Sequence, residues 1–138
     1  MKNRRAFLKK LTAGTLATGF LPFTKKADAG KVRLTGALVH HVFFWLREPD
    51  NPAHKKQLVE ALNQLLEIET IKISHIGFPA GTESRDVVDH SYSVSYMVLF
   101  DNQAGQDAYQ VHPVHKKFVE ENQHLWEKVV VYDSVDDK

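Results

Sequence analysis

The sequence predicts an α+β fold of the ferredoxin-like type, a βαββαβ unit in a single domain. Segments with the composition of strands alternate with amphipathic helical segments in the order strand, helix, strand, strand, helix, strand. Residues 30–138, which remain after an N-terminal export signal, are enough for one domain with a core of its own and too few for two.

Residues 1–29 have the pattern of a cleaved twin-arginine signal peptide. The pair Arg4 and Arg5 precedes an uncharged stretch too short to span a bilayer, and two lysines and a small-residue cleavage pattern at 27–29 follow. We therefore expect export through the twin-arginine route, with a periplasmic or external location and no membrane association after cleavage. Residues 30–138 would form the mature domain.

Composition argues against several classes of function. Without the signal segment, the chain has 11 Lys and Arg residues against 16 Asp and Glu residues, so its net charge is negative. This balance does not favour binding to nucleic acid, and we expect no nucleic-acid partner. The chain has no cysteine, which excludes disulfides and thiolate nucleophiles.

Four segments are rich in β-branched and aromatic residues and are predicted to be strands: 38–47, 71–78, 91–100 and 127–133. A helix should begin at Asn51-Pro52, where a capping side chain precedes a proline, and should end near Glu67.

The segment from Asp101 to Gln123 is predicted to be helical with a break in the middle. Pro113 cannot continue a helix but suits the start of one, so one helix should end near Val111 and another should begin after the corner. Tyr109 and His115 flank this corner, and two groups that can exchange protons at one apolar corner suit general acid–base chemistry.

The first strand is apolar on both faces. Its period of two places His41, Phe43 and Trp45 on one face, and His40, Val42, Phe44 and Leu46 on the other. Because helices cover one face of such a sheet, an apolar face is left for a partner, and we expect a second copy of the chain, as a two-fold homodimer. We assign the face with His40 to this dimer contact.

Three groups of residues resemble the stress-responsive dimeric α/β-barrel family, known as Dabb. They are His40-His41-Val42-Phe43-Phe44 in the first strand, Tyr109-x-x-His112-Pro113-x-His115 at the corner, and Trp126-Glu127-Lys128 with Asp133 in the last strand. The resemblance covers residues 38–134. It implies a ferredoxin-like protomer that pairs into a dimeric α/β barrel.

The resemblance also implies a site. One class of members, the olivetolic acid cyclases, closes a polyketide by an aldol-type condensation, and the match to it implies catalytic roles for Tyr109 and His115 and a pocket position for His41. We expect His41 to assist catalysis and His112 to contact the ligand. The match also implies pocket walls between the helices and the sheet, formed by Phe43, Trp45, Tyr96, Phe118, Trp126 and Val129. The expected ligand is a small apolar or aromatic molecule.

Three functions remain open on the sequence: a cyclase- or lyase-like enzyme, a non-catalytic ligand-binding or stress-protective dimer, and a cofactor-free monooxygenase-like barrel. The histidine pairs at 40–41 and at 112 and 115 raise the question of a metal. Pro113 bends the chain between the second pair and no acidic ligand is close in sequence, so we expect no metal site and no cofactor.

Overall fold

The computed structural model describes residue 30 and residues 34–136, so the export signal predicted for residues 1–29 lies outside the described part. The elements are β1 (Leu38–Leu46), α1 (Pro52–Leu65), β2 (Ile73–Gly77), β3 (Val94–Phe100), α2 (Gln103–Val111), α3 (Pro113–Asn122), a short 3-10 turn η1 (Gln123–Leu125) and β4 (Trp126–Val135). The predicted βαββαβ order is confirmed, and β2 is shorter than expected.

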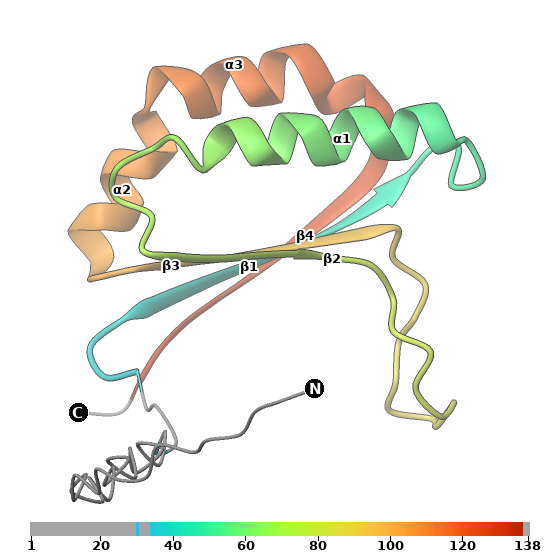
Figure 1. The fold of residues 1–138 in the computed structure, drawn as a ribbon, viewed down its shortest axis with the longest axis horizontal. Helices are drawn as coiled ribbons and strands as arrows, with labels where there is room; N and C mark the ends of the chain where they lie inside the picture. The colour runs from blue at the N-terminus through green and yellow to red at the C-terminus, as the bar shows by residue number, and fades with distance from the viewer. Residues whose placement is uncertain (1–29, 31–33, 137–138) are drawn as a thin grey trace, which may run out of the picture. The chain divides into compact units, whose positions relative to one another are not determined.

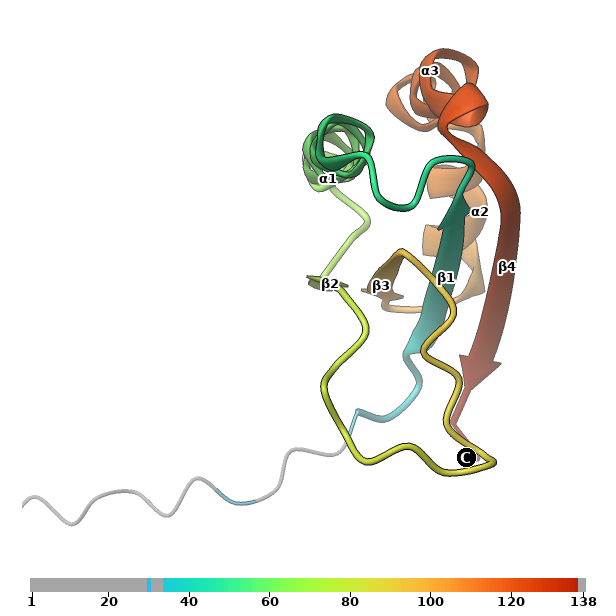
Figure 2. The same ribbon diagram turned by 90° about the vertical axis from the view of Figure 1, so that its right-hand side faces the viewer.

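The four strands form one antiparallel sheet in the order β2-β3-β1-β4. This is the strand order of the ferredoxin-like fold, with β1 and β3 in the centre. Helices α1 and α3 lie on the same side of the sheet (Figures 1 and 2), and no described helix lies on the other side. None of the described helices is long and apolar enough to cross a membrane.

Local chemistry sets the helix boundaries. The side chain of Asn51 accepts hydrogen bonds from the backbone N–H groups of Ala53 and His54, and Pro52 follows it at the start of α1. His112 does the same for α3: its Nδ1 accepts from the N–H of Val114 at 3.2 Å, and its extended backbone separates α2 from α3. The predicted break before Pro113 is therefore present.

The predicted assignment of the two faces of β1 is reversed in the structure. Burial alternates along β1, and the buried side chains under the helices are Leu38, His40, Val42, Phe44 and Leu46. The other face, which carries no described helix, has His41, Phe43 and Trp45. Because both faces are apolar, the period of two separates the side chains into two sets without telling which set the helices cover.

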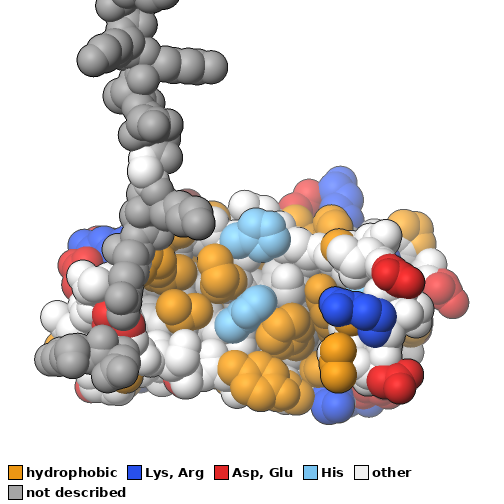
Figure 3. Space-filling view, turned by 90° about the horizontal axis from the view of Figure 1, so that it is seen from below, with side chains coloured by type: hydrophobic (Ala, Val, Ile, Leu, Met, Phe, Trp, Pro, Cys, Tyr) orange, Lys and Arg blue, Asp and Glu red, His pale blue; other side chains and the backbone are white. Residues whose placement is uncertain are grey.

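We call the face without helices the open face. Figure 3 shows this side of the molecule, where hydrophobic side chains gather around histidines. In register order, His41 of β1 lies between Met97 of β3 and Tyr132 of β4, and Met97 in turn pairs with His75 of β2. Tyr132 is 64% exposed, so its ring meets water in the single chain, while His41, Phe43 and Met97 beside it are half-buried.

Candidate acid–base site

A cavity of about 270 Å³ lies between the covered face of the sheet and the corner that joins α2 to α3. Its polar lining consists of His40, Tyr96, Tyr109, Gln110, His115 and Gln123. Its apolar lining includes Val42, Phe44, Phe118, Trp126, Val129 and Val131. A small volume with apolar walls and a few convergent polar groups is typical of small-molecule sites.

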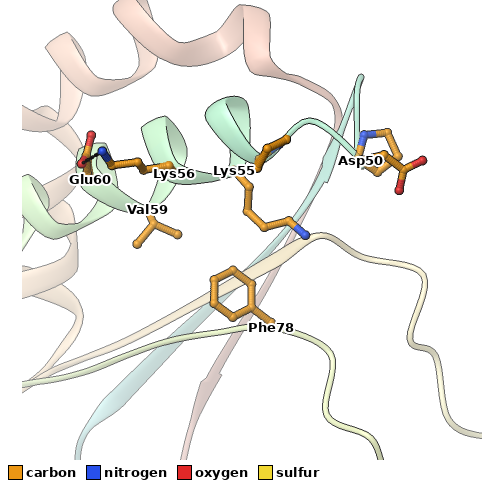
Figure 4. A pocket seen from close by; sticks show the side chains of 8 residues that line it. Asp50, Lys55, Lys56, Val59, Glu60 and Phe78 are labelled. Carbon is orange, nitrogen blue, oxygen red and sulfur yellow. Dashed lines mark ion pairs between the residues drawn. The ribbon is translucent and has the colours of Figure 1, made fainter.

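A wider groove of about 610 Å³ lies elsewhere, between α1 and the chain just after β2 (Figure 4). There the ammonium of Lys55 lies 5.8 Å from the centre of the Phe78 ring, and Lys56 pairs with Glu60 at 3.5 Å. None of the described residues that line this groove is a histidine or a tyrosine. The smaller cavity is therefore the candidate for chemistry at neutral pH.

Tyr109 enters the cavity from the last turns of α2 and is 1% exposed. Burial raises the pKa of Tyr109 to about 12, and the nearby Tyr96 hydroxyl acts in the opposite direction without reversing the shift. The phenol is therefore protonated at neutral pH and can donate a hydrogen bond. Among the described residues, the Tyr96 hydroxyl is buried and has no hydrogen-bond partner. It is available to a ligand.

His115 lies in the first turn of α3, and its ring centre is 4.6 Å from that of Tyr109. Its Nδ1 is 3.2 Å from the carbonyl oxygen of Gln110, the hydrogen bond of a ring that carries its proton on Nδ1. Burial lowers the pKa of His115, the charge of His40 adds to this, and the hydrogen bond to Gln110 opposes it. The imidazole is therefore neutral at pH 7, with an unprotonated Nε2 that can act as a base.

His40 lines the cavity, although its face of β1 was predicted to form the dimer contact. It is 6% exposed, and its Nδ1 donates to the Oδ1 of Asp133 at 2.6 Å. Its ring lies edge-on to Tyr109 at 5.8 Å. Asp133 reaches it because the register of β1 with β4 places the two residues opposite each other. A carboxylate that accepts from Nδ1 fixes the tautomer and leaves Nε2 as an acceptor.

The structure brings together most of the residues predicted to form the site. Tyr109, His115, Tyr96, Phe118, Trp126 and Val129 line the cavity. The predicted positions of His41, Phe43 and Trp45 are wrong, because they lie on the open face. His112 does not line the cavity either: it caps α3, and its Nε2 lies 3.8 Å from a Glu69 carboxylate oxygen.

Two adjacent histidines explain the error at His41. A shift of one residue in a strand moves every side chain to the opposite face, so His41 and His40 exchange roles when the covered face is misjudged. A buried histidine needs a hydrogen-bond partner, and Asp133 in the last strand could have indicated that His40 is the histidine on the covered face. No group of three or more histidines and carboxylates in the described residues is placed to bind a metal.

Residues 38–136 match the family described as the stress responsive A/B barrel domain, Dabb. The chain belongs to this family. No curated protein matches the sequence. Among solved structures, a Dabb family protein of Mesorhizobium loti has a ferredoxin-like fold and is 24% identical, with a TM-score of 0.62, over 75% of this chain and 100% of its own.

Two solved structures that share the fold of this chain are enzymes. A hydroxynitrile lyase of Passiflora edulis is 20% identical with a TM-score of 0.64, over 76% of this chain and 97% of its own. A cofactor-independent oxygenase of Streptomyces nogalater is 8% identical with a TM-score of 0.54, over 75% of this chain and 96% of its own. Other proteins with this fold are described as dimeric. At these identities the likeness shows the fold alone.

Proposed function

We propose that this protein is a small-molecule enzyme that uses the cavity for acid–base catalysis of the cyclase or lyase kind. The observation that carries the proposal is the pair of Tyr109 and His115. A phenol that remains protonated and an imidazole that remains neutral lie 4.6 Å apart, ring centre to ring centre, at a largely apolar cavity. These are the protonation states that a hydrogen-bond donor and a general base need at neutral pH.

In this proposal His115 removes a proton from an acidic C–H or O–H of the substrate through Nε2. Tyr109 donates a hydrogen bond to the substrate oxygen on which negative charge develops, and the imidazole of His40, held by Asp133, lines the same cavity and can accept a hydrogen bond from a substrate hydroxyl. The proton returns from His115 to the product or the leaving group, so the cycle needs no cofactor. Positioned acid–base groups contribute roughly 10²–10⁴-fold to a rate.

Ligand binding without turnover is the second candidate, because the apolar walls and the unpaired Tyr96 hydroxyl would hold a ligand whether or not a proton moves. Cofactor-free oxygenation is a third, supported by the fold shared with the oxygenase. Only this last function consumes dioxygen, so a measurement with an oxygen electrode distinguishes it from the other two.

A cavity-blocking variant tests whether the cavity binds ligands at all. Val131 lines the cavity, and Val131→Phe should fill part of its 270 Å³. Val111→Phe is a matched control, because Val111 is 63% exposed at the end of α2 and lies outside the lining. With a panel of phenols and aryl ketones, ligand-observed NMR should show binding to the wild type and to Val111→Phe only. Equal binding to Val131→Phe would exclude this cavity as the site.

We further propose that the protein is a homodimer in which the open face of one copy packs against that of the other. Support comes from the apolar surface of β1, with Tyr132 of β4 beside it, and from the dimeric state described for proteins of the same fold. Burying such a surface is the main favourable contribution to association.

Export of the mature domain is part of the proposal and rests on the sequence of residues 1–29. Replacing Arg4 and Arg5 together by lysine keeps the charge and removes the guanidinium groups of the twin-arginine pattern. The precursor should then accumulate in the cytoplasm, which a fractionation experiment measures. Normal maturation of this variant would point to the general secretory route.

A further inference from the structure

Three side chains on the open face share one row across three strands. In the strand register, Met97 of β3 pairs with His41 of β1 on one side and with His75 of β2 on the other. All three therefore point to the same face, away from the helices and from the acid–base cavity. His75 is exposed, and His41 and Met97 are half-buried.

The spacing of this row suits a single ion. Paired Cα atoms in antiparallel strands are about 4.5–5.5 Å apart, so His41 and His75 are about 10 Å apart at the backbone, with Met97 midway. An imidazole nitrogen lies about 4–5 Å from its own Cα and binds a metal at about 2 Å. Two histidines across this distance can thus reach an ion held above the flexible Met97 thioether.

A second observation points to a ligand at this place. The Nε2 of His41 is fully enclosed and has no hydrogen-bond partner among the described residues. Its ring packs on Phe43, with the ring centres 4.2 Å apart, so its surroundings are apolar. A buried polar atom without a partner is unfavourable unless something absent from the single chain satisfies it.

The ring of His75 lies over Gly77, where a Cβ atom would come within 2.6 Å of its Cε1. Glycine at this position leaves room for the imidazole along the sheet.

We propose that His41, Met97 and His75 form a copper(I) site on the open face. A thioether is a soft ligand that selects Cu(I), imidazoles suit copper, and this row offers no carboxylate for a hard ion. The three ligands lie on the open face and the acid–base cavity lies on the covered face, so the two sites are independent. All three ligands belong to one chain. A second copy packed on the open face would shield the ion from water.

Competition with bicinchoninate, a coloured Cu(I) chelator, tests the site on residues 30–138 without a histidine tag and without oxygen. The chain has no cysteine, so thiolates cannot contribute. The wild type should withdraw one equivalent of Cu(I) per chain. Met97→Leu and His75→Gln should each weaken binding by at least about tenfold, while His124→Gln, an exposed histidine in η1, should not change it.

Met97→Leu conserves volume, so circular dichroism and light scattering should show an unchanged fold and assembly. X-ray absorption of the copper complex should show one sulfur and two nitrogen ligands, with the sulfur absent in Met97→Leu. The proposal is overturned if the wild type withdraws no Cu(I), or if Met97→Leu binds it as tightly. It is also overturned if Zn(II) displaces Cu(I) equally well from both proteins, because imidazoles alone would then bind the metal.

Discussion

Phe43 and Phe44 are neighbours in β1 that lie on opposite faces of the sheet, so alanine at each position should have a different consequence. Phe44 is 3% exposed and lies under the helices, with its ring centre 5.1 Å from Trp126 and 6.4 Å from Phe118. Phe43 lies on the open face, half-buried, against His41 and Tyr92.

Phe44→Ala leaves a cavity in the core and should lower the free energy of unfolding by about 3–5 kcal/mol. For a domain of this size, whose total stability is about 5–15 kcal/mol, that corresponds to a fall in Tm of more than about 10 °C. Phe43→Ala should lower the stability of the protomer by only about 1 kcal/mol, because the side chain is partly exposed already. Its main effect should be weaker dimerisation, by roughly 2 kcal/mol or about 30-fold in Kd.

Urea denaturation at several protein concentrations separates the two effects, because a loss of dimer affinity depends on concentration and a loss of core packing does not. Light scattering measures the assembly directly. The reasoning would be refuted if Phe44→Ala dissociated the dimer with little loss of protomer stability while Phe43→Ala unfolded the chain. That outcome would restore the face assignment drawn from the sequence.

Two further predictions concern the histidines. Asp133→Asn replaces the charged acceptor of His40 by a neutral one and should lower the free energy of unfolding by about 1 kcal/mol. The value is modest because the carboxylate is 49% exposed. Urea denaturation measures the loss, and ¹⁵N shifts of the His40 ring should report a change in its hydrogen bonding. Burial lowers the pKa of His41 and of His115 from 6.5, so as the pH falls these histidines are protonated in the unfolded chain before they are protonated in the folded chain. The free energy of unfolding should therefore be greatest above about pH 6.5 and fall as the pH drops below it. His115→Gln should make this fall shallower in denaturation curves between about pH 5 and pH 8, and an unchanged slope would contradict the assigned burial.

The local signals in the sequence predicted most of the fold. Asn51-Pro52 and His112-Pro113 define helix starts by capping and by the missing N–H of proline, and these effects act over a few residues. Strand composition identified the four strands, although β2 is limited to Ile73–Gly77 because only these residues pair with β3. Corner residues Tyr109 and His115 were also found from local spacing.

The non-local part of the site could not be predicted in the same way. Which face of β1 the helices cover depends on the whole sheet, and an apolar strand with two adjacent histidines gives no local preference. The hydrogen bond between His40 and Asp133 joins residues 93 positions apart, and it follows from the register of β1 with β4. The row of His41, Met97 and His75 likewise appears only when three strands are placed side by side.

The central claim, that the cavity is an acid–base site, is tested most directly by proton exchange. In D₂O, NMR can follow loss of the α-protons of small aryl methyl ketones and β-diketones, which report removal of a proton from carbon without knowledge of the natural substrate. Tyr109→Phe keeps the buried ring and removes the donor, and His115→Gln removes the base while keeping a polar side chain.

The wild type should accelerate exchange of at least one compound in this panel relative to buffer. His115→Gln should reduce that acceleration by about 10²-fold or more and Tyr109→Phe should reduce it by a smaller factor, with each variant within about 1 kcal/mol of wild-type stability. Exchange no faster than in buffer for every compound, or an equal rate for wild type and His115→Gln, would contradict the account.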